Sequence, residues 1–258
     1  MLKFSSKNAK LERINEWTDK KQTIYSFSLP SGYTCPGALD CRSFANKNTG
    51  KIIDGKDTKY RCFSASTESM FPSVRNQRWD NFEPLKKLDA TDMVKAIRED
   101  LPKDMNILRV HVGGDFFHQR YFDAWLAIAR LNPTKTFYAY TKSIHMWVAR
   151  IKTIPGNFKL NASRGGKYDN LIDEYKLKEA VVVFSLEEAE AKNLEIDHNE
   201  KHALEDTGNF ALLIHGTQPK GSKASEALKS LKKQGINSGY SRKESIKARL
   251  RWKAYGYR

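Results

Sequence analysis

Strand-like and helix-like segments alternate along most of the chain and predict an α/β fold. Six short runs rich in β-branched and aromatic residues have the length and composition of strands. They lie at residues 23–29, 106–112, 136–140, 158–161, 180–184 and 209–214. Apolar residues between the later runs recur with helical spacing, most clearly at 119–131. Because strands that alternate with helices form parallel sheets, we predict a mostly parallel sheet.

Six strands are too few for a closed (β/α) barrel, which has eight. We therefore predict an incomplete (β/α)6 TIM-like barrel over residues 1–240, with a cysteine-bearing insertion at about 30–105 after the first strand. A flat, doubly wound sheet is the alternative architecture. Both place functional groups at the carboxyl ends of the strands. Residues 241–258 form a basic tail with helical spacing, which we treat as a separate segment.

All three cysteines of the chain, Cys35, Cys41 and Cys62, follow the first predicted strand with the spacing Cys-x5-Cys-x20-Cys. Their odd number argues against a disulfide framework. Thiolates are soft ligands that suit iron–sulfur clusters and zinc. Since the spacing matches no standard zinc motif, we predict a [4Fe-4S] cluster held by the three cysteines. A zinc site and three free thiols are the alternatives.

Polar, small or glycine residues follow the other predicted strands. A glycine-rich acidic turn after the second strand can expose backbone groups and bind an ammonium group with its carboxylate. Hydroxyl and cationic side chains after the third and fourth strands can hold a carboxylate or a phosphate. A tight turn and ordinary solvated charge are the alternatives for these segments. The candidate cofactor-binding residues are Gly113, Gly114, Asp115, Thr141, Lys142, Ser163 and Arg164.

Composition adds a strong positive charge. The chain has 45 Lys and Arg residues against 30 Asp and Glu residues, a net charge of +15, which attracts phosphates, nucleic acid or acidic proteins. In the tail, basic residues alternate with Trp252 and Tyr255, which can stack on nucleotides. A solvated helix that covers the open edge of the barrel is the alternative for the tail. No apolar run reaches about 18 residues and no secretion signal is evident, so we expect a cytoplasmic protein without a membrane span.

Several separated motifs resemble the bacteriophage "gene product eighty-eight" family, a group of phage proteins without a settled function. The motifs are Cys35-Pro36-Gly37-Ala38-x2-Cys41, Tyr60-Arg61-Cys62, Arg109-Val110-His111-x-Gly113-Gly114-Asp115-Phe116 and Tyr138-x-Tyr140-Thr141-Lys142-Ser143. They span roughly residues 25–185 and agree in order. The resemblance implies that the protein acts in the cytoplasm of the host cell.

The arrangement is also similar, more distantly, to radical S-adenosylmethionine enzymes. Those enzymes use an incomplete barrel, hold a four-iron cluster on three cysteines after the first strand, and bind the methionine amine at a glycine-rich acidic turn. The similarity implies S-adenosylmethionine as a second cofactor, with Asp115 at its amine. Those enzymes mostly use Cys-x3-Cys-x2-Cys, whereas Cys62 lies twenty-one positions after Cys41.

Three functional hypotheses follow from these features. The first is a phage-type iron–sulfur protein on a barrel like that of radical S-adenosylmethionine enzymes, with or without catalysis. The second is a redox or electron-transfer cluster protein whose partner is an electron donor. The third is a basic nucleic-acid-binding protein with a structural metal site. No catalytic residue is assigned.

Overall fold

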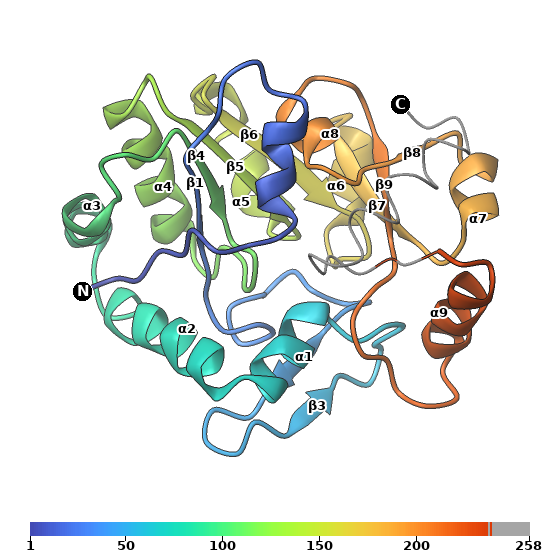
Figure 1. Cartoon of the computed structure of the whole chain (residues 1–258). Helices are drawn as coiled ribbons and strands as arrows, with labels where there is room; N and C mark the ends of the chain where they lie inside the picture. The colour runs from blue at the N-terminus through green and yellow to red at the C-terminus, as the bar shows by residue number, and fades with distance from the viewer. Residues whose placement is uncertain (237, 239–258) are drawn as a thin grey trace.

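The computed structural model describes residues 1–236 and residue 238. Within this part of the chain, a seven-stranded sheet is flanked by helices (Figure 1). In spatial order its strands are β1 (Ile24–Phe27), β4 (Ile107–Val110), β5 (Thr136–Thr141), β6 (Phe158–Ser163), β7 (Glu179–Val183), β9 (Phe210–Leu213) and β8 (Glu195–Ile196). Every neighbouring pair is parallel. The predicted α/β class and mostly parallel sheet are confirmed.

The prediction of six strands is wrong: the main sheet has seven, and the β2–β3 hairpin forms a separate two-stranded sheet. All six predicted strands are present, and β8 adds a seventh beside β9. The sequence does not predict a strand at Glu195–Ile196, because two residues are too few to show a periodic pattern. Strands β1 and β8 are the two edges of the sheet, so the sheet is not a closed barrel within the described residues.

Helices connect and cover the strands. Their bounds are α1 (Phe63–Met70), α2 (Pro72–Leu85), α3 (Ala90–Asp100), α4 (Gln119–Leu131), α5 (Ile144–Val148), α6 (Asp169–Glu174), α7 (Leu186–Ala191), α8 (Lys201–Leu204) and α9 (Lys223–Lys233), with 3-10 helices at Leu11–Glu16 and Ile151–Thr153. Helix α4 has the predicted bounds because one face, with Tyr121, Phe122 and Trp125, is fully buried against the sheet. Helices α1 and α2 are separate, because Phe71 is extended and Pro72 begins a new helix.

The predicted insertion after β1 lies at one end of the sheet. It contains an antiparallel hairpin of β2 (Ser43–Ala45) and β3 (Ile52–Asp54), followed by α1, α2 and α3. Figure 1 shows the hairpin, α1 and α2 together below the sheet. Cys62 is the residue immediately before α1. The insertion therefore faces the carboxyl ends of the parallel strands, where the loops after β4, β5 and β6 also lie.

The N-terminal segment (residues 5–17) contacts both edges of the sheet. Ser5 exchanges two backbone hydrogen bonds with Ser26 of β1, at 2.9 and 2.8 Å. At the other end of the segment, the Trp17 indole donates to the carbonyl of Asn199, shortly after β8, at 3.0 Å. Figure 1 shows the 3-10 helix of this segment in front of the sheet. Among the described helices, none has the length and apolar character needed to cross a membrane.

Candidate functional site

A cavity of about 160 Å³ lies at the carboxyl ends of the strands, and all three cysteines line it. We call it the thiol cavity. Of the seven candidate cofactor-binding residues, five line it with the cysteines: Gly113, Gly114, Asp115, Lys142 and Ser163. The structure thus brings together residues that the sequence places after four different strands.

The predicted iron–sulfur cluster is wrong. Cys35, Cys41 and Cys62 are free thiols. Among the residues that the structure describes, no group of three or more His, Cys, Asp or Glu side chains is arranged to hold a metal ion. The predicted iron–sulfur and redox functions, and the alternative with a structural metal, all required such a group. Binding of S-adenosylmethionine and a partnership with an electron donor stay predictions.

Burial raises the pKa values of all three thiols. Burial raises the pKa of Cys62 to about 12, and the neighbouring Cys41 adds to the rise. Burial likewise raises the pKa of Cys35 well above its ordinary value, with contributions from Asp115 and the other two thiols. Burial also raises the pKa of Cys41, although Lys142 opposes the rise. At neutral pH the thiols are therefore protonated and uncharged.

The guanidinium of Arg61, the residue before Cys62, is engaged by Asp54. Its Nε donates to the Asp54 carboxylate at 3.1 Å, and its terminal nitrogen pairs with the same group. This hydrogen-bonded ion pair joins the end of β3 to the start of α1. It lowers the pKa of Asp54 rather than that of a cysteine.

Asp115 joins the loops after β4 and β5. Its carboxylate accepts hydrogen bonds from the Thr141 hydroxyl at 2.6 Å, the Lys142 backbone N–H at 2.8 Å and the Phe116 backbone N–H at 2.7 Å. Burial raises its pKa to about 6 even though these three donors favour the carboxylate. Thr141 thus acts on the cavity through Asp115 rather than as part of the lining.

The two glycines before Asp115 are explained by close packing. A Cβ atom on Gly113 would lie 2.2 Å from the Ser64 hydroxyl and 2.5 Å from the Arg78 guanidinium. Gly114 has a φ of 82°, and a Cβ atom there would lie 2.8 Å from the carbonyl oxygen of Leu29. Glycine is therefore required for the turn to pack against α1, α2 and the end of β1.

The remaining candidates lie after β5 and β6. The Lys142 ammonium donates to the carbonyl of Ser163 at 2.8 Å and to that of Arg164, so it ties these two strand ends together. Arg164 lies outside the thiol cavity, where it pairs with Asp173 and Glu179. Of the predicted anion-binding cations, Lys142 therefore lies at the cavity and Arg164 does not.

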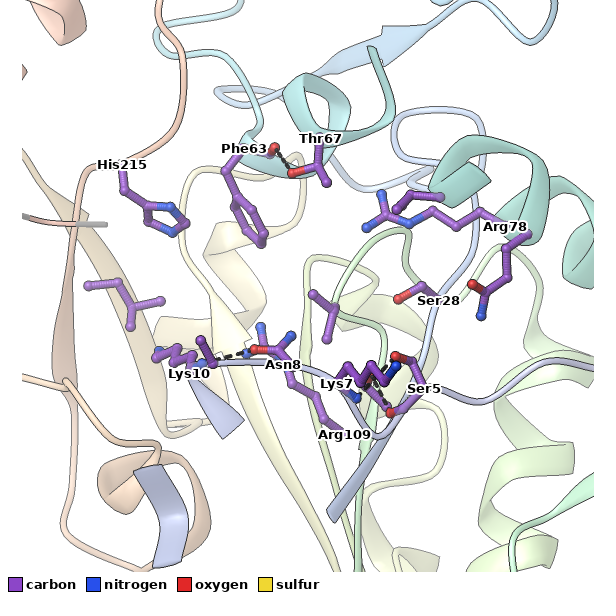
Figure 2. A pocket seen from close by; sticks show the side chains of 16 residues that line it. Ser5, Lys7, Asn8, Lys10, Ser28, Phe63, Thr67, Arg78, Arg109 and His215 are labelled. Atoms are coloured by element: carbon purple, nitrogen blue, oxygen red, sulfur yellow. Dashed lines mark hydrogen bonds between the residues drawn. The ribbon is translucent and has the colours of Figure 1, made fainter. Parts of the chain in front are cut away.

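A second cavity, of about 400 Å³, adjoins the first on the side of the N-terminal segment. We call it the basic cavity, because its charged lining residues are Lys7, Lys10, Arg78 and Arg109. Figure 2 shows Lys7 and Lys10 on the N-terminal segment, Arg109 on β4, and Arg78 approaching from α2. Hydroxyl and amide side chains from Ser5, Ser26, Ser28, Thr67, Asn8 and Gln77 complete the polar lining. This cavity is not predicted from the sequence.

Glu200 holds two of these cations in place. Its carboxylate lies 2.6 Å from the Lys10 ammonium, 2.9 Å from the Arg109 guanidinium and 3.1 Å from the Tyr140 hydroxyl. Burial opposes ionisation of Glu200, but Arg109 and Lys10 bring its pKa below the ordinary value. Glu200 is fully buried and has a φ of 64°, a left-handed conformation that is strained for a residue other than glycine.

Arg78 is held by a separate buried carboxylate. It pairs with Glu68, and it donates to both the backbone carbonyl and the hydroxyl of Ser64. Glu68 in turn accepts from the backbone N–H and hydroxyl of Ser31, at 2.9 and 2.7 Å. Neither Glu68 nor Glu200 lines the basic cavity. The carboxylates therefore lie behind the cations and leave the cavity surface positive.

Buried His111 is hydrogen-bonded at one ring nitrogen within the described residues. Its Nε2 lies 3.0 Å from the Tyr121 hydroxyl, whereas its buried Nδ1 has no hydrogen-bond partner in the described part of the chain. Burial, aided by Arg109, lowers its pKa to about 3, so the ring is neutral. A φ of 70° also gives this residue a strained, left-handed backbone.

The tail at 241–258, for which a nucleic-acid interface and a solvated helix are the alternatives, lies outside the described residues. The nucleic-acid partner therefore stays a prediction. His198 and His202 are half-buried and lie near the 3-10 helix and β8, and His202 pairs with Glu195 at 3.1 Å.

Comparison with known proteins gives the family but no activity. A "Gene 88 protein" of Mycobacterium phage L5 is 30% identical in an alignment of 160 positions, which covers 52% of this chain and 59% of that relative. The chain thus spans about three-fifths of the relative's length. No solved structure matches, and the similarity to radical S-adenosylmethionine enzymes is not shown. The family model described as Gene product 88 matches residues 2–236, and the chain therefore belongs to the Gene product 88 family.

Proposed function

We propose that the protein binds a small phosphate-bearing molecule in the basic cavity. The volume of about 400 Å³ lies within the range of about 300–1,000 Å³ that is usual for ligand sites. Four cations line the cavity, and no Asp or Glu of the described chain does. This uniformly positive lining is the observation that carries the proposal, because Lys and Arg are the usual partners of phosphate oxygens.

The arrangement of charge favours an anion over a merely structural ion cluster. Glu200 offsets Lys10 and Arg109 from outside the cavity, and Glu68 does the same for Arg78. These two carboxylates reduce the cost of burying three cations, but their charge is smaller than that of the lining. Lys7 is exposed and adds a fourth cation. An anionic ligand in the cavity would meet these cations in its lining.

We further infer that the sheet curves as part of a TIM-like barrel around this cavity. In a flat sheet, five strand spacings would separate β4 from β8, about 24 Å at the usual spacing of about 4.7 Å. Arg109 on β4 nevertheless contacts Glu200, which lies four residues after β8. Asn161 on β6 also donates to the carbonyl of Ala203 in α8, at 3.0 Å. Curvature brings these groups together on the concave side.

The proposal is tested by calorimetric titration with inorganic pyrophosphate at low and moderate salt. We expect saturable binding that weakens with salt, because the contacts are charge-assisted. Lys7→Ala should weaken binding about fivefold and Lys7→Glu more, in line with about 1 kcal/mol for one charge-assisted contact. Lys95→Ala and Lys95→Glu change the same charge on an exposed part of α3 and are the matched controls. Equal affinities for the Lys7 and Lys95 variants would contradict the proposal.

A further inference from the structure

The basic cavity and the thiol cavity adjoin each other. Five residues line both: Phe63, Arg109, Val112, Leu212 and His215. The rings of Phe63 and His215 lie 4.5 Å apart, and Figure 2 shows both at the edge of the basic cavity. The two spaces therefore share part of their lining, and a ligand that occupied both would pass these five residues.

The thiol cavity suits an uncharged group, unlike its neighbour. Its three thiols are protonated, and burial lowers the pKa of His111 and of His215 to about 3. Its charged residues are each engaged by protein groups: Arg61 by Asp54, Arg109 by Glu200, Lys142 by two carbonyls, and Asp115 by three donors. Aromatic rings of Tyr60, Phe63 and Tyr140 complete the lining, and such rings pack well against flat groups.

His111 supplies a hydrogen-bonding group in this cavity. His111 is one of the residues that line the cavity and is only 3% exposed, its ring packs against Phe116 and Tyr121, and its Nδ1 has no partner among the described residues. Buried polar atoms are nearly always hydrogen-bonded, and an exception needs an explanation. His111 also has a left-handed backbone conformation, which is unusual for a residue other than glycine, and such backbone strain concentrates at functional sites. Both features are explained if a ligand atom pairs with Nδ1.

We propose that the ligand is a nucleotide, with its phosphate in the basic cavity and its base in the thiol cavity, hydrogen-bonded to His111 Nδ1. This inference rests on the proposed function and specifies its ligand. Phosphate needs the cations around Arg109, whereas a nucleobase is flat, uncharged and rich in hydrogen-bonding groups. The two cavities match these two parts and share the wall between them.

The test compares the four ribonucleoside 5′-monophosphates with inorganic pyrophosphate. Calorimetry gives each affinity, and mass spectrometry follows alkylation of Cys35, Cys41 and Cys62 by N-ethylmaleimide. We expect at least one nucleotide to slow alkylation about tenfold by occupying the thiol cavity, and pyrophosphate to bind without slowing it. His111→Asn should weaken that nucleotide about tenfold, the usual effect of one lost hydrogen bond to a buried group, and leave pyrophosphate unchanged.

His118→Asn is the matched control, because His118 precedes α4, lies outside both cavities, and Asn preserves its capping role. Equal nucleotide affinities for wild type and His111→Asn would overturn the inference. Nucleotide binding that does not slow alkylation of the thiols would also overturn it. If pyrophosphate still bound in either case, the proposed function would stand alone. If neither probe bound, both proposals would be wrong. If the thiols do not react with N-ethylmaleimide even without ligand, the test rests on the nucleotide affinity of wild type compared with that of His111→Asn.

Discussion

Glu200→Gln perturbs the ion cluster behind the basic cavity while keeping the shape of the side chain. The carboxylate is fully buried and contacts Lys10, Arg109 and Tyr140 within 3.1 Å. Removing one partner of a buried ion pair typically costs about 3–5 kcal/mol, because the opposite charge loses its compensation. Gln keeps one acceptor oxygen, so we expect the lower half of that range, about 3–4 kcal/mol.

Thermal unfolding followed by circular dichroism measures this effect. For a chain of this size, 1 kcal/mol corresponds to a shift in Tm of about 2 °C or somewhat more, so Glu200→Gln should lower Tm by roughly 6–12 °C. Glu205→Gln is the control, because Glu205 is exposed and lies 3.9 Å from Lys201 in a surface pair worth less than about 1 kcal/mol.

Pyrophosphate gives a second readout of the same variant. Without the Glu200 carboxylate, the basic cavity carries more positive charge, so the probe should raise Tm more in Glu200→Gln than in wild type. A Tm for Glu200→Gln within 1–2 °C of that for Glu205→Gln would refute the reasoning that the carboxylate holds the cluster together.

Three further predictions concern the surrounding structure. Gly37→Ala should lower Tm strongly, because the new Cβ would lie 2.0 Å from the carbonyl oxygen of Lys142. Gly156→Ala is the control, because its Cβ would meet nothing within 4 Å and Tm should hardly change. Equal Tm values for the two variants would contradict the packing argument. His111 has a pKa of about 3 in the folded state and about 6.5 in the unfolded state, so the free energy of unfolding falls as pH falls below about 6.5. In urea titrations, the stability of wild type relative to His111→Asn should therefore decrease by about 2 kcal/mol between pH 7 and pH 5. A difference between the two proteins that does not change with pH would contradict this. Ser185→Ala removes the hydroxyl that accepts from the Glu188 N–H at 3.2 Å, so urea unfolding should show a loss of about 1 kcal/mol, and no loss would exclude a capping role.

The sheet was largely predictable because apolar residues recur with clear strand or helix spacing in its elements. Helix α4 was predicted with its bounds, since its apolar residues recur on one face. Strand β8 was missed because two residues, Glu195 and Ile196, carry no period of their own. The division between α1 and α2 depends on the extended backbone at Phe71, which Pro72 favours because the residue before a proline is sterically disfavoured in the helical conformation.

The candidate site was predictable only in part. Parallel strands end at one edge, and this rule alone placed Cys35, Asp115 and Lys142 around a common cavity. Whether thiols ligate a metal depends on their mutual arrangement and protonation, which spacing in the sequence does not give. The basic cavity was missed because its cations come from segments far apart in the sequence. The one available signal was Arg109, a cation in the middle of the otherwise apolar strand β4.

A crystal structure with tungstate, a heavy mimic of phosphate, tests the central claim most directly. The account predicts an anomalous difference peak in the basic cavity, within hydrogen-bonding distance of Arg109 and at least one of Lys7, Lys10 and Arg78. The peak should be absent from crystals of Lys7→Glu and present in crystals of Lys95→Glu. Tungstate bound only at other surfaces, with the basic cavity containing water alone, would contradict the account.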